Sequence, residues 1–104
     1  MAELPGSYQD FRNDFPELVE AFDALAAAAH EKGPLDEHTR RLVKLGIAIG
    51  GRLEGAVRSA ARQCRESEIA QDEMDQVVAL AVSTIGLPSA VSGRTWIRDE
   101  LSEE

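Results

Sequence analysis

The side chains that could do chemistry in this sequence are few and widely spaced. There is one cysteine, Cys64, and there are two histidines, His30 and His38. A lone cysteine cannot form an internal disulfide, and one thiol with two imidazoles is too few for a zinc site built by one chain. We therefore expect no metal, no cofactor and a reducing compartment, with the histidines in surface or capping positions.

Cys64 is the one thiol that could act as a nucleophile. Neighbouring basic residues such as Arg62 and Arg65 would lower the pKa of an exposed thiol and so activate it. However, Cys64 falls on an apolar helical stripe with Ala60 and Ala61, which is typical of a buried thiol. The spacing favours an inert cysteine and leaves a one-cysteine peroxidase as the weaker alternative.

Charge is distributed unevenly along the chain. The net charge of −8 has the wrong sign for a protein that binds a phosphate backbone, so nucleic acid is excluded as a partner. Residues 40–65 hold seven basic residues and one acidic residue, a balance of +6, whereas the remainder holds four basic and eighteen acidic residues, a balance of −14. The basic segment either pairs with the acidic segments, within the protomer or between subunits, or forms an anion pocket.

The residues that such a pocket would use are arginines. Arg41, Arg52 and Arg58 are the candidates for binding a small carboxylate, because a guanidinium can hold a carboxylate through two parallel hydrogen bonds. Glu54 and Cys64 are the candidates for catalytic roles. If the protein is an enzyme, Arg52 would polarise a carboxylate while Glu54 or a histidine moves the proton.

The elements that must position these residues are helices. Apolar residues recur at helical spacing in five segments, and no internal repeat or long linker interrupts them. Asp14 and Asp36 are expected to cap the first two helices, and Gly33-Pro34, Gly50-Gly51 and Gly86 to end three of them. The residues before Asp14, with Tyr8 and Phe11, are expected to form a short arm. A strand at Leu42–Gly50 is the competing interpretation.

Two stretches resemble a known family. They are TRRLVKLGIAIGGRLEGAVRSAARQC, from residue 39, and DEMDQVVALAVSTIGLPSAV, from residue 72. Their apolar texture, the Asp-Glu-Met helix start and the Gly-Leu-Pro-Ser-Ala turn are similar to the carboxymuconolactone decarboxylase and alkylhydroperoxidase D superfamily. The resemblance implies one all-α domain over residues 1–104, a helical bundle that assembles as a homo-oligomer, a trimer or hexamer.

The peroxidase branch of that superfamily uses Cys-x-x-Cys, then a histidine, with a glutamate about a dozen residues earlier. Aligning the motif here places Leu53 and Ala56 at the cysteines, Ala60 at the histidine and Arg41 at the glutamate. The resemblance therefore implies a degenerate active site that has lost the two-thiol chemistry.

The functional expectation is a binding or assembly module of this family that holds a small anionic ligand. A decarboxylase-type enzyme acting on a lactone acid is the alternative, so the residues leave open whether the protein is an enzyme. A chain of 104 residues with five aromatics has a small core, which also favours an oligomer. Because residues 1–6 do not resemble a signal peptide and no run is long enough to span a bilayer, we expect a cytoplasmic protein with no membrane partner.

Overall fold

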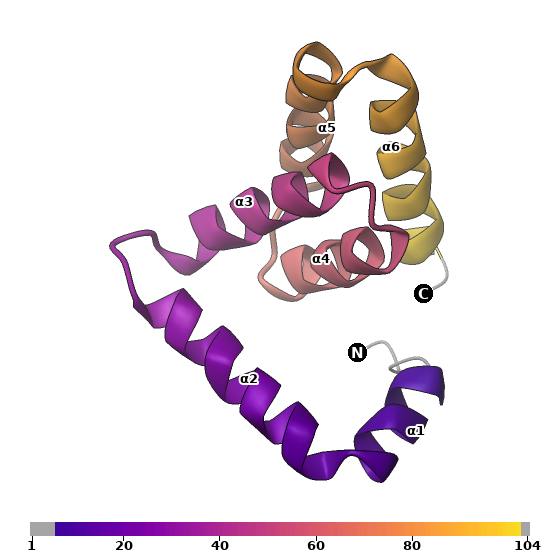
Figure 1. Ribbon diagram of the computed structural model, residues 1–104. Helices are drawn as coiled ribbons and strands as arrows, with labels where there is room; N and C mark the ends of the chain where they lie inside the picture. The colour runs from indigo at the N-terminus through magenta and orange to yellow at the C-terminus, as the bar shows by residue number, and fades with distance from the viewer. Residues whose placement is uncertain (1–5, 103–104) are drawn as a thin grey trace. The chain divides into compact units, whose positions relative to one another are not determined.

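The computed structural model describes residues 6–102, which form six α-helices and contain no strand (Figure 1). The chain divides into two compact units, one ending at Leu35 and the other beginning at Asp36. The expectation about a signal peptide concerns residues 1–6, of which residues 1–5 lie outside the described part of the chain. The prediction of a single domain over residues 1–104 stays a prediction.

The first unit contains α1 (Gly6–Asp14) and α2 (Pro16–Glu31). The expected arm around Tyr8 is thus a helix, and the predicted count of five helices was one too low. Asp14 does not cap α2, because it belongs to α1 and Phe15 occupies the cap position without a side-chain cap bond. Pro16 opens α2 at a position where a missing N–H costs nothing. The rings of Phe11 and Phe15 lie 4.8 Å apart across the junction.

The second unit begins with α3 (Glu37–Gly50), which settles the choice between helix and strand at Leu42–Gly50 in favour of helix. Asp36 caps it as predicted: its carboxylate accepts a hydrogen bond from the N–H of Thr39 at 2.9 Å. The same bond holds the pKa of Asp36 below its usual value. Local sequence therefore fixes where this helix starts.

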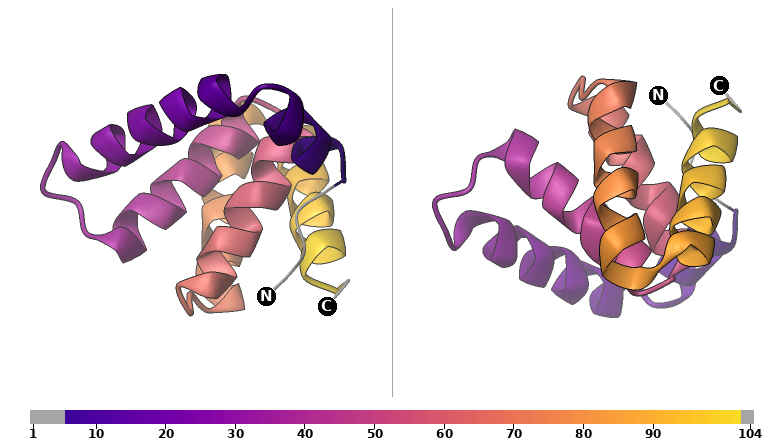
Figure 2. Two further views of the ribbon diagram at one scale, coloured as in Figure 1. Left: turned by 90° about the horizontal axis from the view of Figure 1, so that it is seen from below. Right: turned by 90° about the horizontal axis from the view of Figure 1, so that it is seen from above.

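Three further helices complete the unit: α4 (Glu54–Glu66), α5 (Gln71–Ile85) and α6 (Leu87–Ser102). The chain turns back after α3 into α4, and α5 and α6 lie side by side in opposite directions (Figures 1 and 2). Pro88 is the second residue of α6, as expected of a proline that starts a helix. Both the breaks and the order of these helices agree with the sequence prediction.

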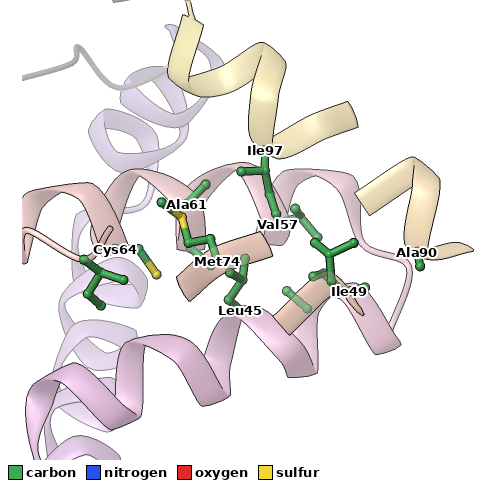
Figure 3. Close-up of a cluster of buried hydrophobic side chains, with 12 residues drawn as sticks. Leu45, Ile49, Val57, Ala61, Cys64, Met74, Ala90 and Ile97 are labelled. Carbon is green, nitrogen blue, oxygen red and sulfur yellow. The ribbon is translucent and has the colours of Figure 1, made fainter. Parts of the chain in front are cut away.

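The core of the second unit is a continuous cluster of apolar side chains between the four helices (Figure 3). All its buried members lie between Leu45 and Ile97, and the largest fully buried ones are Leu45, Ile49, Met74, Ile97, Val57 and Cys64. Gly93 on α6 approaches α3 so closely that a Cβ there would lie 3.2 Å from two side-chain carbons of Ile49. Small residues thus set the spacing between these helices.

Two helices end in the same backbone motif, with a residue other than glycine in the left-handed conformation. After α3, the N–H of Arg52 bonds to Ile49 O and the N–H of Leu53 bonds to Ala48 O, with Arg52 at φ 56°. After α4, Glu68 repeats this arrangement at φ 60°. This is the Schellman arrangement, in which glycine usually occupies the left-handed position. A side chain there costs about 1 kcal/mol.

The basic and acidic segments of the sequence meet within the second unit. Arg62 on α4 lies 2.7 Å from Glu100 on α6, and both side chains are only 14% exposed. Arg58 lies 3.5 Å from the other carboxylate oxygen of Glu100. These pairs hold the pKa of Glu100 below its usual value, because the two guanidinium groups outweigh the opposing effect of burial. Much of the charge asymmetry therefore serves the packing of α4 against α6.

Candidate functional site

Cys64 is completely buried on the inner face of α4, near Ala61, Met74 and Leu45 (Figure 3). Its Sγ lies 3.7 Å from the backbone carbonyl oxygen of Arg41. Burial raises the pKa of the thiol to about 11, although the charge of Arg41 acts in the opposite direction. At neutral pH the group is therefore a protonated thiol, which is a poor nucleophile.

The sequence resemblance places the two cysteines and the histidine of the peroxidases at Leu53, Ala56 and Ala60, which lie just before and within α4. Leu53 precedes the helix and is 59% exposed, and Ala56 is exposed as well, so neither lies on the apolar inner face of α4. Ala60 is buried in the core. None of these three side chains can ionise or carry a redox reaction. In this segment the buried face consists of Val57, Ala60, Ala61 and Cys64.

Arg41, which the resemblance implies at the position of the peroxidase glutamate, contacts α4. Its Nη1 donates to Gln63 Oε1 at 2.9 Å, and its Nε donates to Ser67 Oγ at 3.2 Å. Its guanidinium also lies 3.8 Å from Glu37 one turn earlier. These contacts join the start of α3 to the end of α4, which makes Arg41 a structural link.

Arg52 lies in the turn between α3 and α4 and is exposed. Its Nε donates to Ser89 Oγ at 2.8 Å, so the first turn of α6 orients the guanidinium. This bond uses Nε, so the two Nη groups can donate two parallel hydrogen bonds to one carboxylate. Arg52 thus has a left-handed backbone conformation that glycine would adopt at lower cost, and its guanidinium is oriented by Ser89.

Arg58 and Glu54, which were both candidates, bind each other. The Arg58 Nε donates to Glu54 Oε2 at 3.0 Å, one turn apart on α4, and Asp99 lies 3.9 Å from the same guanidinium. Burial opposes the charge of Arg58, but the bonds to Glu54 and Glu100 outweigh it and raise its pKa. Glu54 is thus placed to neutralise Arg58.

The three predicted arginines therefore belong to separate groups of contacts. Arg41 lies near the start of α3, whereas Arg52 follows its end, and the helix between Arg41 and Gly50 is about 14 Å long. Arg41 contacts the end of α4, Arg52 contacts α6 at Ser89, and Arg58 contacts the carboxylates of α6 near its end. A single pocket built from all three stays a prediction, and the contacts give it no support.

A groove that the sequence did not predict lies between α3 and α5. It has a volume of about 530 Å³ and is lined mainly by apolar side chains and by two glycines. The residues that line it on α3 are Leu42, Val43, Gly46 and Gly50, and α5 contributes Glu73, Gln76, Val77, Leu80, Ala81, Thr84 and Ile85. The signal for it was the run Leu42–Gly50, which is apolar on nearly every side and so can line a groove as well as a core.

At the start of α5, the carboxylate of Glu73 forms a hydrogen bond with the imidazole of His38 on α3. The imidazole lowers the pKa of Glu73, and the backbone N–H of Ala70 acts in the same direction. His38 thus bridges two helices at the surface, which agrees with the expected surface role. His30, the other histidine, lies in the last turn of α2.

Among residues 6–102, no group of three side chains that could hold a metal ion occurs. No helix in the same range is long and apolar enough to cross a membrane.

Comparison with known proteins agrees with the helical architecture. Residues 16–99 match the Carboxymuconolactone decarboxylase family. An uncharacterized protein from Haemophilus influenzae is 33% identical over 57 residues, which are 55% of this chain and 50% of that protein. The chain thus spans about half the length of the curated relative that it matches.

A solved structure provides a comparison at the level of the fold. It is the apo form of a carboxymuconolactone decarboxylase family protein from Legionella pneumophila, with a TM-score of 0.79 and 24% sequence identity. The similarity covers 92% of this chain and 86% of that one, which shows a shared fold. Because the family match extends over most of the sequence, the chain belongs to the carboxymuconolactone decarboxylase family and has its alkylhydroperoxidase D-like fold.

Proposed function

We propose that this protein is a member of the family without the two-cysteine peroxidase site, and that it acts as an oligomeric module binding a small carboxylate at Arg52. The observation that carries the proposal is the hydrogen bond from Arg52 to Ser89, which orients an exposed guanidinium on a strained turn. Strained residues persist where their surroundings hold them in place, and they gather at ligand sites.

The loss of redox chemistry is supported by the thiol itself. Cys64 is fully buried, its pKa is raised to about 11, and it is the one cysteine in the sequence. A peroxidase needs an exposed thiolate and, for the two-thiol cycle, a second cysteine to resolve the intermediate. A one-cysteine peroxidase that used Cys64 would lack the exposed thiolate.

A decarboxylase-type enzyme would need a proton carrier beside Arg52. Glu54, the candidate for that role, is bound to Arg58 instead. The side chain that does contact Arg52 is the hydroxyl of Ser89, whose proton is far less acidic than that of a carboxylic acid or an imidazolium. Binding is therefore the function that these contacts favour over catalysis.

Thermal shift and calorimetric titration with a panel of small mono- and dicarboxylates test the proposal. We expect stabilisation of the intact protein by at least one acid, and loss of that effect in Arg52→Gly. Glu68→Gly is the matched control, because it relieves the same backbone strain at the end of α4 without touching the guanidinium. Equal responses of wild type and Arg52→Gly to every acid would rule out Arg52 as the site.

A further inference from the structure

The groove between α3 and α5 combines an apolar wall with one charged side chain. Of the described residues that line it, Glu73 alone carries a charge, and Gln76 and Thr84 are the polar ones. We infer that this groove binds a small apolar molecule with a protonated amine, whose ammonium group contacts Glu73. The inference goes beyond the carboxylate site at Arg52, which is not among the described residues that line the groove.

Glu73 is an oriented and ionised acceptor at the start of α5. Its Oε2 contacts the imidazole of His38, and its Oε1 accepts a hydrogen bond from the backbone N–H of Ala70 at 3.3 Å. The contact with His38 and the bond from Ala70 both favour the charged form and lower the pKa of the carboxyl group. The side chain is still 39% exposed, and each carboxylate oxygen can accept two hydrogen bonds. An ammonium group can therefore bind Glu73 without breaking the existing contacts.

The charges around this end of the groove favour a cation over an anion. Residues 66–93, which include the whole of α5, contain five acidic residues and no lysine, arginine or histidine. The basic residues of α3 are not among the described residues that line the groove, and Arg41 donates to Gln63 on α4 instead. A carboxylate ligand would be repelled by Glu73, whereas an ammonium group would be attracted to it.

The composition of the wall favours a primary or secondary amine over a quaternary ammonium ion. Proteins typically hold quaternary ions against the faces of aromatic rings, and none of the described residues that line the groove is aromatic. The carboxylate of Glu73 accepts hydrogen bonds, so it binds best to a cation that has an N–H to donate. The ligand class is therefore an amine with an alkyl body.

The dimensions of the groove suit a small elongated ligand. Its volume of about 530 Å³ lies within the range of roughly 300–1,000 Å³ that is typical of small-molecule pockets. The wall on α5 runs from Glu73 to Ile85, about 18 Å of helix. On the side of α3, a Cβ added at Gly50 would meet no atom within 4 Å, so the backbone there is open to a ligand. The apolar body can thus lie along the groove with the ammonium group at one end.

Titration of the intact protein with octylamine, followed by calorimetry and heteronuclear NMR, tests the inference. We expect octylamine to shift the amide signals of Gly46 and Gly50, which line the groove, and to leave that of Gly55 on α4 in place. Butylamine should bind more weakly, because each further buried methylene strengthens binding by up to about fourfold. Octanoate, which has the same chain length and the opposite charge, should not shift the signals of Gly46 and Gly50.

Two pairs of variants separate the effect of charge from that of shape. Glu73→Gln should weaken octylamine binding by roughly five- to tenfold, whereas Asp72→Asn removes a neighbouring charge outside the groove and should have little effect. Gly50→Leu should abolish binding by filling the groove. Gly55→Leu is its control, because a Cβ there also meets no atom within 4 Å, and it should leave binding unchanged. Circular dichroism checks that all four variants fold.

The other outcomes overturn the inference. Unshifted signals of Gly46 and Gly50 would mean that the groove does not bind an amine. Equal affinity for octanoate would mean that charge does not select the ligand, and equal weakening by Asp72→Asn and Glu73→Gln would mean a general attraction to an acidic surface. Loss of octylamine binding in Arg52→Gly would place the amine elsewhere. Carboxylate binding at Arg52 is measured by its own titration, so either site can fail without the other.

Discussion

The thiol of Cys64 on α4 lies 3.7 Å from the backbone carbonyl of Arg41 on α3, within the core of the second unit. The one cysteine of the chain therefore helps to pack two helices. Its sulfur is a small apolar group with a weak donor, and no solvent reaches it.

This position predicts a cysteine that resists thiol reagents. With the pKa of the folded thiol at about 11 instead of 9.0, the thiolate fraction at pH 8 falls by about 100-fold, and burial slows access further. Labelling by a chromogenic disulfide should thus be at least about 100-fold slower in the native protein than in urea. A Cys64→Ala/Ser92→Cys variant, with its thiol at an exposed position, provides the fast-reacting comparison. Rapid labelling of native Cys64 would contradict the assignment of an inert thiol.

Replacement of the two strained residues separates stability from binding. Arg52→Gly and Glu68→Gly should each raise the free energy of unfolding by roughly 0.5–1 kcal/mol, because glycine adopts the left-handed conformation without the steric cost. Loss of the bond to Ser89 offsets part of this gain in Arg52→Gly. Urea denaturation measures both values, and a clear decrease in each variant would show that the left-handed backbone carries no strain.

The pair Arg62–Glu100 should contribute more than an exposed ion pair. Glu100→Gln is expected to lower the free energy of unfolding by about 1–2 kcal/mol at pH 7, because two guanidinium groups lose their charged partner. Asp75→Asn, which affects the exposed pairs with Arg94 and Arg98, should cost less than about 1 kcal/mol.

The pH dependence of the Glu100 effect follows from the direction of its pKa shift. Since the folded pKa lies below the ordinary value of 4.5, the ionised carboxylate favours the native state. Its contribution is fully present above pH 4.5 and is lost as the pH falls through the folded pKa. The difference between wild type and Glu100→Gln should therefore shrink in acid, and a difference that is constant down to pH 3 would contradict the ion-pair origin.

Adding a side chain at Gly93 and at Gly55 should have opposite effects on the free energy of unfolding. Gly93→Val should lower the free energy of unfolding by about 1–3 kcal/mol, because even a Cβ there presses on Ile49. Gly55→Ala on α4 meets nothing within 4 Å and should raise stability by about 0.5 kcal/mol. Thermal unfolding of the two variants checks both signs, and a Gly93→Val protein as stable as wild type would mean that α6 shifts away from α3 without cost.

The sequence predicted a helix correctly where apolar residues at helical spacing occurred together with a capping residue. Asp36 and the glycines after α3 are local features, so they predicted the bounds of that helix correctly. The segment Gly6–Asp14 has polar residues on most sides and little apolar periodicity, and it was therefore predicted as an arm although it is helical. Asp14 was assigned the wrong role for the same reason, because it is the last residue of α1 and Phe15 occupies the cap position of α2.

The candidate site was less predictable, because its geometry depends on contacts between distant residues. The inert character of Cys64 followed from its neighbours one turn away, and the structure confirms its burial. In contrast, Ser89 is 37 residues from Arg52, and no local pattern pairs them. The contact between Arg62 and Glu100 spans 38 residues, and no local pattern pairs these two residues either.

The buried residues of the apolar core all lie between Leu45 and Ile97, so the second unit and α2 can open separately. Amide protons in α3 to α6 are protected by a shared core and exchange only when that whole unit opens, whereas the amides of α2 have no part in this cluster. The amides of α2 can therefore exchange when that helix alone opens. Hydrogen exchange would report the opening of α2 and the opening of the second unit as separate events in one measurement.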